Sequence, residues 1–210
     1  MNDELKTVRD DLAFLRAIAE GGGERGGLGA PGAGLYGSAG LLYGAQTLGH
    51  FAQVKGVLAM PPLGNLLLGW LPTVIFLILM TVVIVIDRKR PQVGASNRAV
   101  SAAFSATGLA NLALIVIFAA AAVRNQDFKY WLFHPAVVFV VQGAVWFVVF
   151  TLRKRAWMAL VSAGWLVAGI AMGLLIDRPD LYLLIAALGL FAFMMVPGFH
   201  MMRQASRPAR

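Results

Sequence analysis

Long apolar runs alternate with short polar segments along the chain, and no run contains a charged residue. About 20 residues at roughly 1.5 Å rise cover the hydrocarbon layer of a bilayer, and six runs reach that length. They are residues 35–54, 66–86, 99–123, 132–152, 156–176 and 181–202. Because lipid cannot satisfy backbone polar groups, each run must be helical. The pattern predicts an all-α integral membrane protein with six transmembrane helices, of which the first is the most polar.

Residues 1–20 show a different pattern, that of an amphipathic helix. Leu5, Val8, Leu12 and Leu15 recur at spacings of three and four, as in a coiled-coil seam. Six of the ten acidic residues lie in the first 24 positions, whereas a helix that binds an anionic membrane surface would be basic. We therefore expect these four side chains to dock against protein: a second copy, the chain's own basic loops or a cytoplasmic partner.

Residues 21–34 connect this helix to the first apolar run, and eight of the fourteen are glycine. Such a composition predicts a flexible tether. Residues 27–32 match the G-x-G-x-x-G pattern of dinucleotide sites, but that pattern requires a preceding strand and a βαβ unit. Neither is expected here, so we interpret the segment as a linker.

Charge is concentrated at the ends of the apolar runs. The net charge is +8, and with the N-terminus inside, 14 of the 18 Lys and Arg residues fall on the cytoplasmic side. The other four are Lys55, Arg124, Lys129 and Arg178. By the positive-inside rule both termini are cytoplasmic, with residues 203–210 as a basic tail, and a bacterial-type inner membrane is expected. The positive charge thus reflects topology, and no nucleic-acid partner is predicted.

The six runs also suggest three repeated hairpins. Small-residue motifs occupy the first, third and fifth runs, at residues 38–40, 105–108 and 162–164, while the even runs are bulkier. Small residues allow close helix contact, so we expect the odd helices at the centre and the even helices toward lipid. Duplicated hairpins are common in transport folds, although a small apolar alphabet can imitate a repeat.

The polar residues at membrane depth are few, and they are the candidates for a neutral cavity. The candidate lining residues are Tyr43, Gln46, His50, Asn111 and Gln142. The alternative is that these side chains form hydrogen bonds that hold helices together.

Catalysis, metal binding and cofactor binding are not expected. There is no cysteine, and no apolar run carries a carboxylate for proton transfer or coupled transport. His50 and His134 both fall toward the outer face, and two facing imidazoles can hold haem or contribute to a metal site. With no third ligand or acid at that depth, interfacial histidines without a ligand role are the better interpretation.

Two function classes follow. The first is a non-enzymatic regulatory, sensory or scaffold protein that docks a cytoplasmic partner or a second protomer through residues 1–20. The second is a channel or facilitator for a neutral or weakly polar solute. The seam and the tether favour the first, and the small-residue centre favours the second.

Overall fold

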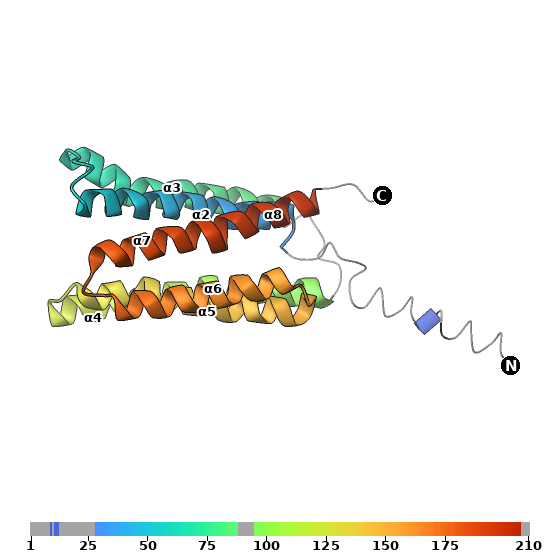
Figure 1. Cartoon of the computed structure of the whole chain (residues 1–210). Coiled ribbons are helices and arrows are strands. Elements are labelled where there is room, and N and C mark those ends of the chain that lie inside the picture. The colour runs from blue at the N-terminus through green and yellow to red at the C-terminus, as the bar shows by residue number, and fades with distance from the viewer. Residues whose placement is uncertain (1–8, 10, 13–27, 88–94, 207–210) are drawn as a thin grey trace.

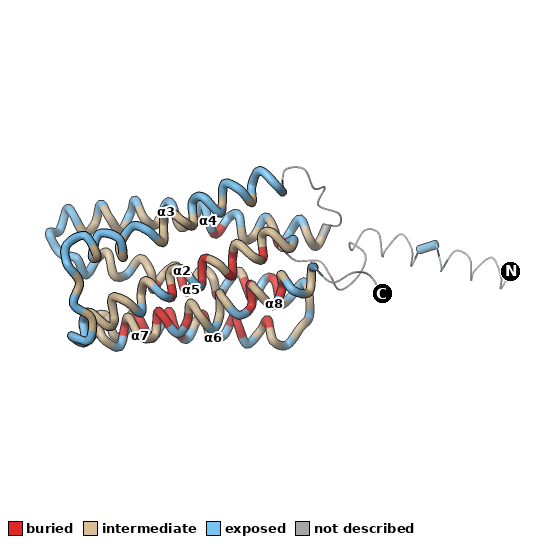
Figure 2. The backbone as a smooth tube through the Cα atoms, turned by 90° about the horizontal axis from the view of Figure 1, so that it is seen from above, coloured by how far each residue is buried: buried red, intermediate tan, exposed pale blue. Residues whose placement is uncertain are grey.

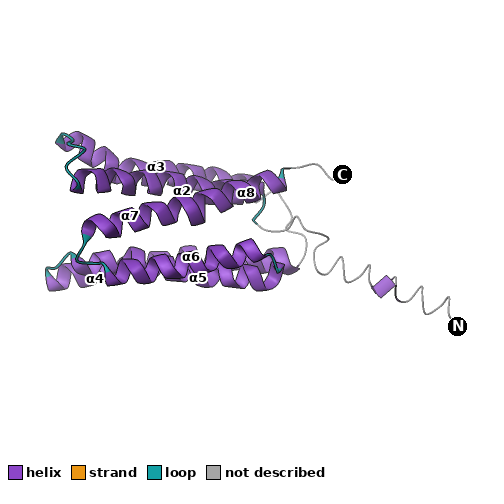
Figure 3. Ribbon diagram, viewed as in Figure 1, coloured by secondary structure: helices purple, strands orange, loops and turns teal. Residues whose placement is uncertain are grey.

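The computed structural model describes residues 9, 11–12, 28–87 and 95–206, and within them the regular structure is entirely helical (Figures 1 and 3). The elements are α2 (Ala30–Val54), α3 (Pro62–Asp87), α4 (Ala95–Asn125), α5 (Lys129–Arg153), α6 (Ala156–Leu174), α7 (Pro179–Leu190), a π-helical turn η1 (Phe191–Met195) and α8 (Val196–Ala205). The segments α7, η1 and α8 follow one another without a break, so they form one long helix with a π-helical interruption.

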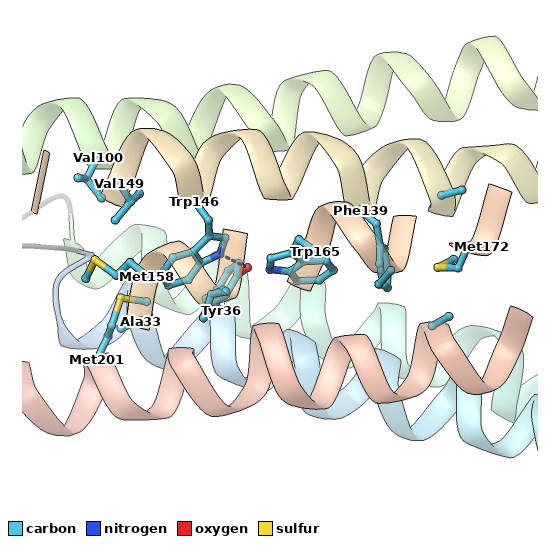
Figure 4. Close-up of a cluster of buried hydrophobic side chains, with 14 of the residues drawn as sticks. Ala33, Tyr36, Val100, Phe139, Trp146, Val149, Met158, Trp165, Met172 and Met201 are labelled. Carbon is cyan, nitrogen blue, oxygen red and sulfur yellow. Dashed lines mark hydrogen bonds between the residues drawn. The ribbon is translucent and has the colours of Figure 1, made fainter. Parts of the chain in front are cut away.

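Neighbouring helices pack in the spatial order α3, α2, α7, α6, α5, α4 (Figures 1 and 2). The two outer members of this row, α3 and α4, each have one principal neighbour. The interior lies between α2, α5, α6 and the α7–α8 helix, where Trp146, Trp165 and Met172 are fully buried (Figure 4).

Five helices are long and apolar enough to cross a membrane: Pro62–Ile86, Ser96–Asn125, Lys129–Arg153, Ala156–Leu174 and Pro179–Ala205. They fit a multi-pass membrane protein, as the apolar pattern predicted. The first predicted run is also helical but lies outside this group, because its glycines and polar side chains make α2 less apolar.

Helix α2 begins at Ala30, within the segment that we expected to be tether up to residue 34. Pro31 suits the first turn of a helix, where its missing N–H has no intrahelical partner to lose. Gly34 and Gly37 then face Met202 and Phe199 of α8. These glycines therefore allow α2 to pack closely against α8. A glycine-rich composition is the same for a flexible linker and for a packed helix face, so it could not tell the two apart.

Most other helices also extend beyond their apolar runs. Helix α3 begins at Pro62, α4 begins at Ala95, and α8 continues to Ala205, into the predicted basic tail. Helix α6 is shorter than predicted and ends at Leu174. Polar residues at a membrane interface can remain helical, so counting apolar residues underestimates helix length.

The expected placement of odd helices at the centre is wrong for the third one. None of the residues in the most apolar part of α3 is buried, and almost none in α4, although α4 carries the small-residue motif at residues 105–108. The bulky α5 instead contributes Phe139, Trp146 and Val149 to the core. A small-residue motif permits close packing but does not require it, and the repeat is not confirmed.

The predicted docking helix lies mostly outside the described residues. Arg9, Asp11 and Leu12 are helical, while Leu5, Val8 and Leu15 lie outside the described part of the chain. The Leu12 side chain is 60% exposed.

Candidate functional site

The candidate cavity residues of α2 pair with the neighbouring helix α3. The Gln46 side-chain amide donates a hydrogen bond to the carbonyl oxygen of Gly69 at 2.8 Å. The Tyr43 ring packs on Phe76 with 5.6 Å between centroids. Both contacts join α2 to α3, which has no other principal neighbour.

His50 belongs to a second polar group near the α2–α3 connection. Its Nδ1 lies 3.1 Å from Oε1 of Gln53, and the Gln53 amide donates to Oδ1 of Asn65 at 2.5 Å. The hydrogen-bond partner of His50 is therefore a residue of its own helix. The chain His50–Gln53–Asn65 closes the end of the α2–α3 hairpin.

Asn111 of α4 pairs with His134 of α5. The His134 Nε2 lies 3.0 Å from the Asn111 side-chain oxygen, and the imidazole stacks on Trp131 with 5.1 Å between centroids. Because His50 bonds Gln53 and His134 bonds Asn111, the structure gives the two histidines separate partners.

Gln142 belongs to a buried polar cluster that sequence reasoning missed. The indole of Trp146 donates to the hydroxyl of Tyr36 at 2.8 Å (Figure 4). That hydroxyl donates in turn to Oε1 of Gln142 at 3.3 Å. Tyr36 is 7% exposed and Trp146 is completely buried, and Phe104 of α4 packs edge-on against both rings. Buried Tyr and Trp side chains normally find such hydrogen-bond partners. The sequence feature that could have revealed this cluster is the position of Tyr36 beside Gly37, in a glycine-rich helix.

The five candidate lining residues thus fall into separate groups between α2 and α3, between α4 and α5, and between α2 and α5. Each has a hydrogen-bond or ring partner within the bundle. For Gln46, Asn111 and Gln142 the partner lies on another helix, an arrangement that suits interhelical hydrogen bonding.

A glycine seam on α2 holds the last helix at close range. A Cβ added at Gly40 would lie 2.9 Å from the carbonyl oxygen of Leu190 and closer still to the backbone nitrogen of Met195. A Cβ at Gly44 would lie 2.8 Å from the ring of Phe191. The spacing of these glycines matches one face of a helix, and that face covers the π-helical turn η1.

The π-helical turn leaves a backbone carbonyl for a side chain to satisfy. Pro197 has no N–H, so it cannot donate to Phe193, four residues earlier. The indole of Trp165 on α6 donates to that carbonyl oxygen at 3.1 Å instead. The Val196 N–H bonds back to Phe191, which is the i→i+5 pattern of a π-helix.

The two ends of the bundle differ in how they hold charge. At one end, Lys129 pairs with Asp177 at 2.5 Å, and Asp180 lies 3.6 Å from Lys55 and 3.8 Å from Arg178. These ion pairs tie the start of α5 to the α6–α7 loop and the end of α2 to the start of α7.

At the opposite end, neutral amides hold the arginines of the α5–α6 turn. An Arg153 Nη2 donates to the side-chain oxygen of Asn97, and Arg155 Nη1 donates to Oε1 of Gln204 at 3.1 Å. Asn97 lies on α4 and Gln204 on α8, so these bonds connect four helices in one polar layer.

Comparison with family models, with curated proteins and with solved structures gives no match. Function must therefore be inferred from the chain's own residues.

Proposed function

We propose that this chain is a non-enzymatic regulatory, sensory or scaffold component of a membrane, which docks a cytoplasmic partner or a second protomer through its N-terminal helix. The single observation that carries the proposal is the exposure of Leu12, whose side chain is 60% exposed in a helical segment. The sequence places Leu5, Val8 and Leu15 on the same predicted seam, which would give a helix over residues 1–20 an apolar face for a partner.

The paired interior of the bundle supports this function over a conduit. A channel for a neutral solute needs polar groups that are available to the solute, whereas Gln46, Asn111 and Gln142 are engaged by other helices. The alternative, a channel or facilitator, therefore has less support than a bundle that anchors or senses.

The topology within this proposal is six spans with both termini cytoplasmic, in a bacterial-type inner membrane. Helix α2 has 25 residues, enough at about 1.5 Å rise to cross the hydrocarbon layer, and it packs along α3 and α7. The end that holds the Lys129–Asp177 and Lys55–Asp180 ion pairs fits the outer surface, and the end that carries Arg153, Lys154 and Arg155 fits the inner surface.

Native mass spectrometry of the full chain, extracted gently from its own membrane, tests the docking function. We expect a bound protein or a dimer that disappears on deletion of residues 2–24 and in Leu12→Asp. Asp11→Asn is the matched control, because Asp11 is an exposed neighbour outside the seam. Assembly that survives both the deletion and Leu12→Asp would overturn the proposal.

A further inference from the structure

The α5–α6 turn carries three consecutive basic residues, Arg153, Lys154 and Arg155, that join two tightly packed helices. Lys154 adopts a left-handed backbone conformation with φ of 55°, and its N–H caps α5 by bonding to Phe150. The Lys154 side chain is exposed, whereas Arg153 and Arg155 are half-buried. The turn therefore brings one accessible ammonium between two arginines held against the bundle.

A neutral side chain positions Arg153 without cancelling its charge. The Asn97 amide accepts from Arg153, and the Gln204 amide accepts from Arg155. Among the described residues, no carboxylate lies within ion-pair distance of Arg153 or Lys154, and the Nε of Arg153 is buried without a hydrogen-bond partner. A partly buried guanidinium normally has a counter-charge, so among the described residues the positive charges of Arg153 and Lys154 are unbalanced.

At the opposite end of the bundle, basic side chains have carboxylate partners. Lys129 and Lys55 both pair with aspartates there. The two ends therefore differ in the partners of their basic side chains as well as in their number: aspartates hold the lysines at one end, and amides contact the arginines at the other. Positive-inside topology requires cations on the cytoplasmic loops but does not require that amides position them.

Two further basic residues lie next in sequence to the amides that contact these arginines. Arg98 on α4, one residue after Asn97, and Arg203 on α8, one residue before Gln204, are both exposed. Trp157, in the first turn of α6, lies 5.7 Å from Trp146 and 5.4 Å from His200 between ring centroids. An indole beside cations is the usual composition of the headgroup level of a membrane.

We propose that the α5–α6 turn binds the phosphate of an anionic phospholipid headgroup in the inner leaflet, with Lys154 and Arg153 as the main contacts and Arg155 beside them. Guanidinium and ammonium groups are the preferred partners of phosphate oxygens, and basic clusters next to membrane spans attract anionic lipid. A bound headgroup would supply the negative charge that the amides lack.

Titration with phosphatidylglycerol, read by native mass spectrometry of the full chain in detergent, tests this site. We expect phosphatidylglycerol to bind more tightly than phosphatidylcholine with the same acyl chains. The double variant Arg153→Gln with Lys154→Gln should lose about tenfold or more in phosphatidylglycerol affinity, because each basic residue near the surface contributes to anionic-lipid binding.

A control variant removes the same charge from the opposite end: Lys55→Gln with Arg124→Gln. It should change phosphatidylglycerol affinity by less than about twofold if the site is local. Equal losses in both double variants, or equal affinity for the two lipids in the unaltered chain, would overturn the proposal.

Two further arms separate folding from binding and lipid from free anion. Lys154→Gln alone changes an exposed side chain, so it should keep the unfolding temperature and still weaken phosphatidylglycerol binding; unchanged binding would count against the site. Displacement of the lipid by millimolar inorganic phosphate would identify phosphate alone as sufficient, and resistance would identify the intact lipid as the ligand. The chain lacking residues 2–24 should retain the site, so this result is independent of the docking function.

Discussion

The indole Nε1 of Trp165 donates a hydrogen bond of 3.1 Å to the carbonyl oxygen of Phe193. The two residues lie on different helices, α6 and the π-helical turn η1. Pro197 removes the N–H that would serve this carbonyl in an α-helix. In a membrane no water is present to replace it, so the tryptophan allows the last helix to be interrupted without leaving a polar group unpaired.

Trp165→Phe should therefore lower stability by about 1–3 kcal/mol, the cost of a buried carbonyl without a partner. Denaturation of the full chain in detergent measures it, with Trp70→Phe as the control because Trp70 is 66% exposed. In a Pro197→Ala background an N–H becomes available to Phe193, so the cost of Trp165→Phe should shrink. An equal cost in both backgrounds would show that the carbonyl is not the reason.

Gly40→Ala should destabilise the bundle by about 1–3 kcal/mol, because the added methyl group would meet the backbone of Met195 and Leu190. Backbone atoms cannot rotate away as a flexible side chain can. Gly108→Ala is the matched control: its Cβ would meet nothing within 4 Å, and alanine favours a helix over glycine by about 1 kcal/mol. Thermal unfolding should rank Gly108→Ala at or above the unaltered chain and Gly40→Ala well below it.

These two glycines also show where sequence reasoning reached its limit. Uninterrupted apolar runs predicted the helices, because hydrophobic length is written locally in the chain. The motifs around Gly40 and Gly108 look alike in sequence, yet one contacts backbone and the other faces outward. Which face of a helix receives a neighbour depends on the other helices, and no local pattern contains that information.

The polar residues likewise include some that the sequence singled out and one, Tyr36, that it did not. Gln46, Asn111 and Gln142 stood out because amides are rare at membrane depth. Tyr36 did not, although its hydroxyl joins Trp146 to Gln142, because a tyrosine in an apolar helix is as common at a surface as in a core. The π-helical turn likewise packs its Phe191 and Met195 against Gly44 and Gly40 of α2, a tertiary relationship that no local pattern contains.

Single-cysteine labelling checks the proposed orientation, and the chain has no native cysteine to interfere. Gln126→Cys lies in the exposed α4–α5 connection and Lys154→Cys in the exposed α5–α6 turn, at opposite ends of α5. With cytoplasmic termini, an impermeant thiol reagent added to intact cells should label Gln126→Cys, and Lys154→Cys only after lysis. The reverse pattern would invert the topology, and equal labelling of both in intact cells would refute a spanning α5.

Asn111→Leu distinguishes hydrogen bonding between helices from a solute path. Leucine removes the partner of His134 Nε2, which lies 3.0 Å from the Asn111 oxygen, so stability should fall by about 0.5–2 kcal/mol. In His134→Leu the partner is already absent, and adding Asn111→Leu should cost less than it does alone. Swelling of liposomes in glycerol, which reports neutral-solute flux, should not change. A loss of flux in Asn111→Leu with unaltered unfolding would instead assign Asn111 to a conduit, and would favour the channel over the scaffold.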